Sequence, residues 1–136
     1  MIVTLDKIDD IVFDLHPGDR IFLRGNLGAG KTTFVRKLIQ KYLGNSEAQI
    51  TSPTYTYYQK YGENLYHFDL YRAQNLIDII RTGAQDIFDD DSSICVIEWP
   101  EILGETVQST VTVDISAAEL GREFRIVNCQ APKIDN

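Results

Sequence analysis

One eight-residue segment constrains the fold of this chain more than any other feature. Residues 25–32 read Gly-Asn-Leu-Gly-Ala-Gly-Lys-Thr and match the pattern G-x-x-x-x-G-K-[ST] at every fixed position. An apolar, strand-like run at 20–24 precedes the segment, and residues 31–43 carry apolar side chains at helical spacing. Strand, glycine-rich loop and helix in this order are the context in which the pattern binds phosphate. The alternative is a glycine-rich turn that only starts a helix, and the flanking strand and helix argue against it.

The residue types of this loop follow from the chemistry of phosphate binding. Glycines allow backbone N–H groups to point inward at phosphate oxygens, and the helix N-terminus adds a positive field. The Lys31 ammonium is expected to reach the β- and γ-phosphates of a nucleotide, and the Thr32 hydroxyl to ligate Mg²⁺. The predicted nucleotide-binding residues are Asn26, Leu27, Gly28, Ala29, Gly30, Lys31, Thr32 and Thr33.

The rest of the pattern predicts an α/β fold of the P-loop NTPase type, with a mixed central β-sheet flanked by helices. Residues 94–97 are consecutive apolar residues, which is typical of a strand buried on both faces. Because no repeat, low-complexity tract or linker divides the chain, residues 1–136 are interpreted as one domain. Further strands are expected at 2–5, 20–24, 50–58 and 65–70, with an antiparallel pair at 111–115 and 123–129 near the C-terminus. Helices are expected at 8–15, 31–43 and 76–80, the last capped by Asn75, with a further turn at 85–88.

The charge balance limits the partners. The chain has 13 basic and 20 acidic residues, a net charge of -7. A protein that holds nucleic acid by itself needs a basic face, so contact with RNA is expected only through a partner protein. No uncharged apolar run approaches the roughly 20 residues that cross a bilayer, and no membrane partner is expected. Cys95 and Cys129 lie in apolar stretches and are interpreted as reduced, buried thiols of a cytoplasmic protein.

Two carboxylates follow predicted strands, where P-loop enzymes place the groups that act on Mg²⁺ and on water. Glu98 ends the most apolar strand and is the first candidate for Mg²⁺, while Asp69 is expected to contact the metal indirectly or to orient the attacking water. Their roles could be exchanged, and two surface carboxylates at strand ends are the alternative. Thr54 lies between the loop and these carboxylates and is a candidate switch hydroxyl for the γ-phosphate; ordinary strand propensity is the alternative.

Three nearby residues have simpler interpretations. His67 is interpreted as a packing residue, with a catalytic role as the alternative. Arg72 is interpreted as a structural ion-pair partner of Asp69, with a phosphate contact as the alternative, and Trp99 as a packing residue or interface anchor. Neither Asn-Lys-x-Asp nor Asp-x-x-Gly after a strand occurs, so guanine specificity is not expected and ATP is the inferred nucleotide.

Four motifs together resemble the TsaE (YjeE) family in order and spacing. They are residues 25–33, 51–55 (Thr-Ser-Pro-Thr-Tyr), 67–72 (His-Phe-Asp-Leu-Tyr-Arg) and 97–100 (Ile-Glu-Trp-Pro). The resemblance covers residues 20–101. Members of this family are the ATPase component of the bacterial apparatus that makes threonylcarbamoyladenosine in tRNA. Asn26 stands where members commonly have Asp, at a position that the loop pattern leaves free.

The resemblance implies more than the residues show by themselves. It implies a P-loop fold with a mixed sheet, a Mg²⁺-dependent ATPase that is weak alone, and binding to a TsaD–TsaB heterodimer that ATP hydrolysis resets between turnovers. By the same comparison Thr54 falls in the family's switch segment, and Asp69, Glu98 and Trp99 fall on positions used for activity. The tRNA is then reached through the partners.

Two other functions fit the same loop. A small-molecule kinase would transfer the γ-phosphate to a metabolite, but the arginines are scattered and 136 residues leave little room for a lid and an acceptor pocket. A nucleotide-dependent regulatory module would bind without meaningful turnover.

Overall fold

The computed structural model describes residues 2–4, 12–25, 28–51, 56–118 and 121–128 of the chain. In this part of the chain, seven strands form one sheet in the order β1-β7-β6-β2-β5-β4-β3. The strands are β1 (Ile2–Thr4), β2 (Arg20–Arg24), β3 (Tyr58–Tyr61), β4 (Leu65–Asp69), β5 (Ile94–Glu98), β6 (Val111–Ala118) and β7 (Gly121–Asn128). The helices are α1 (Gly28–Leu43), α2 (Leu76–Ile80), α3 (Ala84–Phe88) and the 3-10 helix η2 (Pro100–Leu103).

The sheet is mixed, as predicted. Its centre is parallel, because β2 pairs in parallel with β5 and β6, and β5 also pairs in parallel with β4. The outer pairs are antiparallel: β3 with β4, β6 with β7, and β7 with β1. The predicted antiparallel strands at the C-terminus are therefore confirmed.

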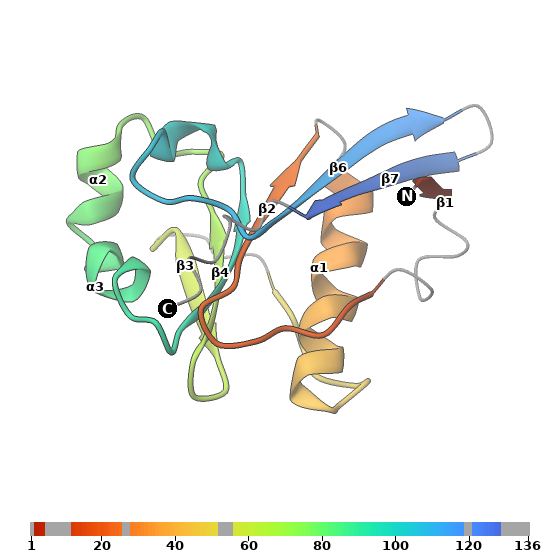
Figure 1. Ribbon diagram of the computed structural model, residues 1–136, viewed down its shortest axis with the longest axis horizontal. Coiled ribbons are helices and arrows are strands. Elements are labelled where there is room, and N and C mark those ends of the chain that lie inside the picture. Colours follow the sequence, from red (N-terminus) through yellow and green to blue (C-terminus); the bar gives the residue numbers. More distant parts are fainter. Residues whose placement is uncertain (1, 5–11, 26–27, 52–55, 119–120, 129–136) are drawn as a thin grey trace, which may run out of the picture.

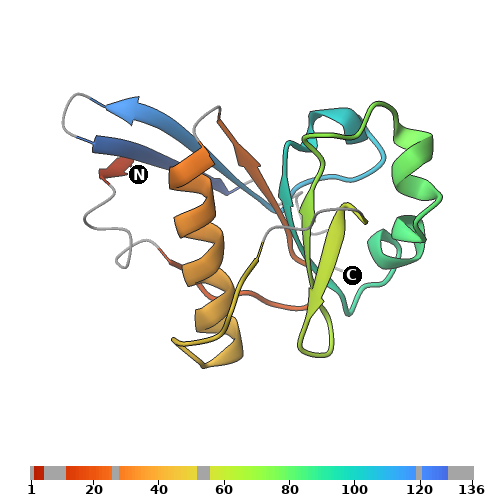
Figure 2. The same cartoon turned by 180° about the vertical axis from the view of Figure 1, so that it is seen from behind.

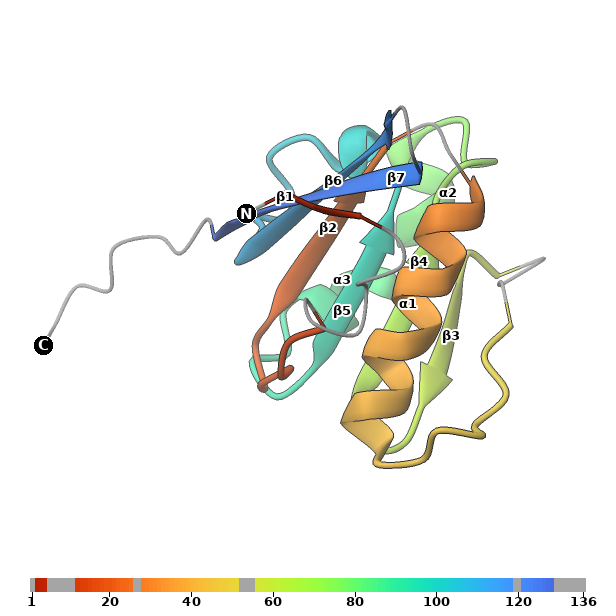
Figure 3. The same cartoon turned by 90° about the vertical axis from the view of Figure 1, so that its right-hand side faces the viewer.

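Helices cover both faces of the sheet. Figure 3 shows α1 in front of the sheet and α2 and α3 behind it, and Figures 1 and 2 show the same arrangement from two opposite sides. Successive side chains of β5 alternate between the two layers: Ile94 and Val96 pack in the α1 cluster, Cys95 and Ile97 in the cluster with α2 and α3. Every residue of β5 is buried, which explains its continuous apolar sequence.

Two local predictions are wrong in part. Residues 12–15, the described part of the helix expected at 8–15, are not helical. Their apolar side chains pack against α1 instead, with the rings of Phe13 and Phe34 6.1 Å apart. Among the described residues of the strand expected at 50–58, Tyr58 alone lies in a strand, where β3 begins, and Tyr57 just before it has a positive φ of 64° that interrupts an extended chain.

Other local predictions are confirmed. The Asn75 side chain accepts a hydrogen bond from the Asp78 N–H at 3.0 Å and caps α2, and α3 forms where a further turn was expected. Cys95 is a buried free cysteine, and burial raises the pKa of its thiol to about 11. Cys129 lies outside the described residues. The described helices include none that is long and apolar enough to cross a membrane.

Candidate functional site

The predicted phosphate loop begins at a glycine that the fold requires. Gly25 follows β2 with a φ of 136°, and a Cβ at this position would lie 2.2 Å from the carbonyl oxygen of Ile115 on β6. Only glycine allows the loop to leave the sheet so close to the neighbouring strand. Gly28, Ala29 and Gly30 form the first turn of α1, so the N-terminus of this helix lies at the carboxyl end of β2. Asn26 and Leu27 lie outside the described residues.

Lys31 is buried at this end of the sheet, with 2% of its surface exposed. Its ammonium nitrogen lies 3.7 Å from the centroid of the Trp99 ring. Burial lowers the pKa of Lys31, and the negative charges of Glu98, Asp69 and Glu101 oppose that shift. The lysine nitrogen thus lies near three carboxylates and an aromatic ring, at the start of a helix.

The two predicted carboxylates are neighbours in the sheet. Asp69 on β4 and Glu98 on β5 are register partners at the carboxyl ends of their strands. The Tyr71 N–H donates to Asp69 Oδ1 at 3.1 Å and fixes the direction of that side chain. Glu98 is 7% exposed and therefore far more shielded from water.

His67 belongs to this site, contrary to its interpretation as a packing residue alone. Its Nε2 lies 2.7 Å from Glu98 Oε2, and both side chains are buried. Strand periodicity alone places His67 and Asp69 on one face of β4, because they are two residues apart. The register that pairs Asp69 with Glu98 then brings the histidine to the glutamate, and the sequence does not give that register.

Trp99 also does more than pack. It has a left-handed backbone conformation, with φ 57° and ψ 56°, and its ring lies 5.0 Å from that of Tyr71. This backbone turn directs the chain from β5 into η2 next to Lys31. Sequence reasoning identified the residue but gave no sign of its contact with the lysine.

The remaining predicted residues divide into three groups. Thr32 is exposed and Thr33 half-buried on the first turns of α1, next to Lys31. Thr54 lies outside the described residues; just before it, the Thr51 N–H donates to the hydroxyl oxygen of Tyr61 at 3.1 Å. Within the described part of the chain, no ion pair joins Arg72 to Asp69, so that predicted pairing is wrong for an arginine that is exposed.

The donor set at this edge fits Mg²⁺ better than a transition metal. Mg²⁺ prefers oxygen ligands and is commonly held by one or two carboxylates together with the phosphates of a nucleotide. Glu98, Asp69 and the Thr32 hydroxyl supply oxygens only. Among the described residues, no three His, Cys, Asp or Glu side chains form a metal-binding group by themselves. Such a site suits a cation that arrives with its phosphates.

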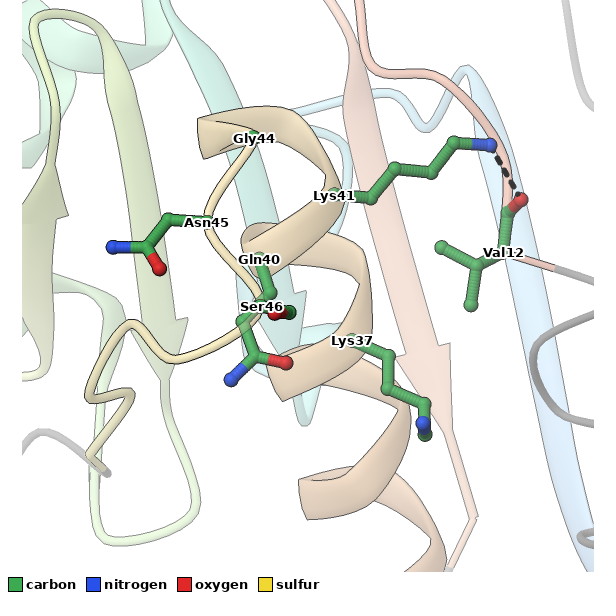
Figure 4. A pocket seen from close by; sticks show the side chains of 7 residues that line it. All are labelled: Val12, Lys37, Gln40, Lys41, Gly44, Asn45 and Ser46. Atoms are coloured by element: carbon green, nitrogen blue, oxygen red, sulfur yellow. Dashed lines mark hydrogen bonds between the residues drawn. The ribbon is translucent and has the colours of Figure 1, made fainter.

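A hollow of about 470 Å³ lies elsewhere on α1, along its second half (Figure 4). Its lysine Lys41 donates to the carbonyl oxygen of Val12 at 3.0 Å and pairs with Asp14 at 3.4 Å. The residues of α1 that line the hollow begin at Lys37, so the hollow is separate from the Lys31 end of the helix. It is lined by Val12, Lys37, Gln40, Lys41, Gly44, Asn45 and Ser46.

One protein family matches most of this chain, including the residues of the site. The family profile described as "Threonylcarbamoyl adenosine biosynthesis protein TsaE" matches residues 4–125. The chain belongs to the TsaE family. The resemblance carried by the four motifs is thereby confirmed and extends well beyond residues 20–101.

Individual TsaE proteins show the same relationship. The chain is 42% identical over 127 residues to "tRNA threonylcarbamoyladenosine biosynthesis protein TsaE" of Haemophilus influenzae. The aligned region covers 89% of this chain and 78% of that protein. It is 37% identical over 93 residues to the protein of the same name from Rickettsia typhi, covering 66% of this chain and 62% of that one. The chain thus spans less than two thirds of the length of the Rickettsia relative.

A solved structure shows the same fold. The crystal structure of YdiB from Bacillus subtilis superimposes with a TM-score of 0.61 at 25% identity, covering 96% of this chain and 88% of that one. The predicted fold class, a P-loop-type α/β domain with a mixed sheet flanked by helices, is confirmed for this TsaE chain.

Proposed function

We propose that this chain is a Mg²⁺-dependent ATPase subunit required for threonylcarbamoyladenosine modification of tRNA. The observation that carries the proposal is the buried Lys31 at the N-terminus of α1, next to the paired carboxylates Asp69 and Glu98. A buried lysine at the N-terminus of a helix presents two sources of positive charge at one point, an arrangement that favours an anionic ligand such as phosphate. Membership of the TsaE family supplies the pathway.

Each residue has a proposed role. Lys31 and the N–H groups of the first turn of α1 bind the phosphates, because both present positive charge at one point. Thr32 and Glu98 hold Mg²⁺, which neutralises phosphate charge when it is bound with the nucleotide. Asp69, fixed by the Tyr71 N–H, orients the attacking water. Thr54, outside the described residues, is proposed as the switch hydroxyl.

We also propose that the ATPase works on a TsaD–TsaB-type complex. ATP is the proposed nucleotide because the chain lacks guanine-recognition motifs. The net charge of -7 favours a protein partner over direct tRNA contact, since nucleic acid repels an acidic surface. The proposed location is the cytoplasm, where the pathway's tRNA substrate is found.

The test is ATP hydrolysis by the purified chain, alone and with its cognate TsaD–TsaB pair, with Lys31→Ala as the blank. A large rise on adding the pair, absent in Lys31→Ala, supports a partner-gated ATPase. Nucleotide binding without any rise would contradict it. A regulatory module or a small-molecule kinase would then be distinguished by supplying candidate phosphoryl acceptors.

Glu98→Ala separates binding from turnover. We expect this variant to retain most of its affinity for ATP in EDTA, because the phosphate-binding helix turn is unchanged, and to lose Mg²⁺-dependent hydrolysis by about 100-fold or more. Glu105→Ala, a change at an exposed glutamate in the turn after η2, is the matched control and should hydrolyse normally. Equal hydrolysis by Glu98→Ala and Glu105→Ala would remove the assigned role of Glu98.

A further inference from the structure

One buried histidine has no part in the proposed function. His67 lies on β4 with 2% of its surface exposed, and its Nε2 is 2.7 Å from Oε2 of Glu98. A carboxylate oxygen only accepts hydrogen bonds, so Nε2 carries the hydrogen and donates it. The distance is at the short end for an N–H bonded to a charged carboxylate, where such bonds are stronger than neutral ones.

The sheet itself holds both partners in place. His67 on β4 pairs with Val96 on β5, and Asp69 pairs with Glu98. The histidine therefore lies two residues before the residue that is opposite the glutamate. Both side chains point to the α1 side, where Val96 also lies. Because β4 and β5 are hydrogen-bonded neighbours, neither backbone can move the donor from the acceptor without breaking the sheet.

Packing alone does not explain a histidine at this position. Its Nδ1 is buried and has no hydrogen-bond partner among the described residues. A buried polar atom without a partner loses its hydrogen bonds to water on folding, a cost that an apolar side chain of similar size would avoid. The compensating feature is the bond from Nε2 to Glu98, which therefore points to the glutamate as the reason for the histidine.

A glutamate has more freedom than its proposed role allows. Its side chain rotates about three bonds, and a carboxylate that must meet a small cation with strict ligand geometry has to be held in one of these orientations. In metal sites the residues that hydrogen-bond a ligating carboxylate do this, and their loss costs about 10- to 100-fold in metal affinity or activity.

We propose that His67 is a positioning residue that holds the Glu98 carboxylate by Oε2 in the orientation that receives the Mg²⁺ of a bound nucleotide. This inference rests on the proposed role of Glu98 at Mg²⁺. His67 touches neither nucleotide nor metal in this scheme, and it acts only through the glutamate.

The test compares three variants by a property that needs no turnover. For each, the dissociation constant of ATP is measured by calorimetry with Mg²⁺ and with EDTA, and the ratio of the two values gives the magnesium gain in affinity. His67→Leu removes the donor, while His67→Asn keeps an amide that is too short to reach the glutamate. His67→Gln places an N–H donor near the position of Nε2.

We expect the magnesium gain to fall about 10-fold or more in His67→Leu and His67→Asn and to be largely restored in His67→Gln. Affinity in EDTA should be unchanged in all three, because Lys31 and the first turn of α1 are untouched. His16→Leu, a change at the chain's other histidine, which is 73% exposed, is the matched control.

The inference would be overturned by an undiminished gain in both His67→Leu and His67→Asn, or by a loss in His67→Gln as large as theirs. A wild-type chain whose ATP affinity does not respond to Mg²⁺ would overturn it as well. A wild-type chain that binds Mg²⁺ and ATP normally but never hydrolyses ATP would instead contradict the proposed function and leave this comparison valid.

Discussion

Two buried cations lie toward opposite ends of β2 and are held in different ways. The Arg20 guanidinium, at the start of the strand, donates to backbone carbonyl oxygens of Ser93 at 2.7 Å and of Phe88 and Asp90 at 3.0 Å. These carbonyls belong to the end of α3 and the turn that leads into β5. Lys31, beyond the other end of the strand, faces the ring of Trp99 and the charges of three carboxylates.

The difference separates a structural cation from a functional one. The guanidinium of Arg20 makes directional hydrogen bonds that join β2 to the end of α3 and to the turn before β5. Losing any of these bonds would leave a carbonyl oxygen without its donor. A ring face and nearby charges attract Lys31 without fixing its direction, so its ammonium can turn to a phosphate. The non-glycine residues with positive φ in the described part of the chain, Tyr57 and Trp99, both lie near the lysine end. Strain of this kind gathers at functional sites.

Replacing Lys31 by methionine gives the largest expected effect on ligand binding. Removing one partner of a buried charged pair costs about 2–5 kcal/mol, so ATP affinity should fall by about 30-fold or more. The free energy of unfolding should stay equal or rise, because burial lowers the pKa of Lys31 in spite of the nearby carboxylates, so folding disfavours the charged lysine that methionine replaces. Calorimetric titration and urea unfolding measure the two quantities. Lys60→Met, at an exposed lysine on β3, is the control; a Lys31→Met chain that binds ATP like this control would contradict the comparison.

The same substitution at Arg20 should have the opposite profile. Arg20→Met leaves several buried carbonyls without donors, and we expect a loss of about 3 kcal/mol in unfolding free energy, or about 10 °C in melting temperature. The folded fraction should bind ATP with unchanged affinity, since Arg20 lies far along β2 from the loop. Arg36→Met, at an exposed arginine on α1, is the matched control. If Arg20→Met unfolds no more easily than Arg36→Met, the arginine is not the structural member of the pair.

The lysine end of the molecule could be predicted from sequence better than the arginine end. Residues 25–32 match a pattern whose fixed positions are the residue types that suit a strand, a glycine-rich turn and a helix in this order, so the strand before the loop and α1 were predicted correctly. The bonds of Arg20 go to backbone carbonyls some 70 residues away, which any sequence supplies. No pattern of side chains in the sequence can therefore predict these hydrogen bonds.

Contacts across the sheet were also beyond prediction. Asp69 and Glu98 were identified because each ends an apolar strand, and the register between β4 and β5 shows that they are paired. The bond of His67 to Glu98 depends on that register, which the sequence leaves open. The helix prediction that is wrong at residues 12–15 has a related cause: apolar spacing shows which side chains are buried, and these residues satisfy it by lying against α1 without helical turns.

The smallest effect concerns the ring beneath Lys31. The contact of a cation with an indole ring contributes about 0.5–2 kcal/mol, less than the losses expected for Lys31→Met and Arg20→Met. Trp99 is the chain's only tryptophan, so its fluorescence reports the contact with Lys31 directly. We expect Lys31→Met to change the emission of Trp99 without any nucleotide, because the ammonium near the ring is gone. Saturating ATP should change the emission of the wild-type chain as the ammonium turns to the phosphates. Lys60→Met, whose lysine lies 5.6 Å from the centroid of the Tyr66 ring, should leave the emission as in wild type. Identical spectra for wild type with and without ATP would mean that Lys31 stays on the ring, and the lysine would then be as fixed as Arg20.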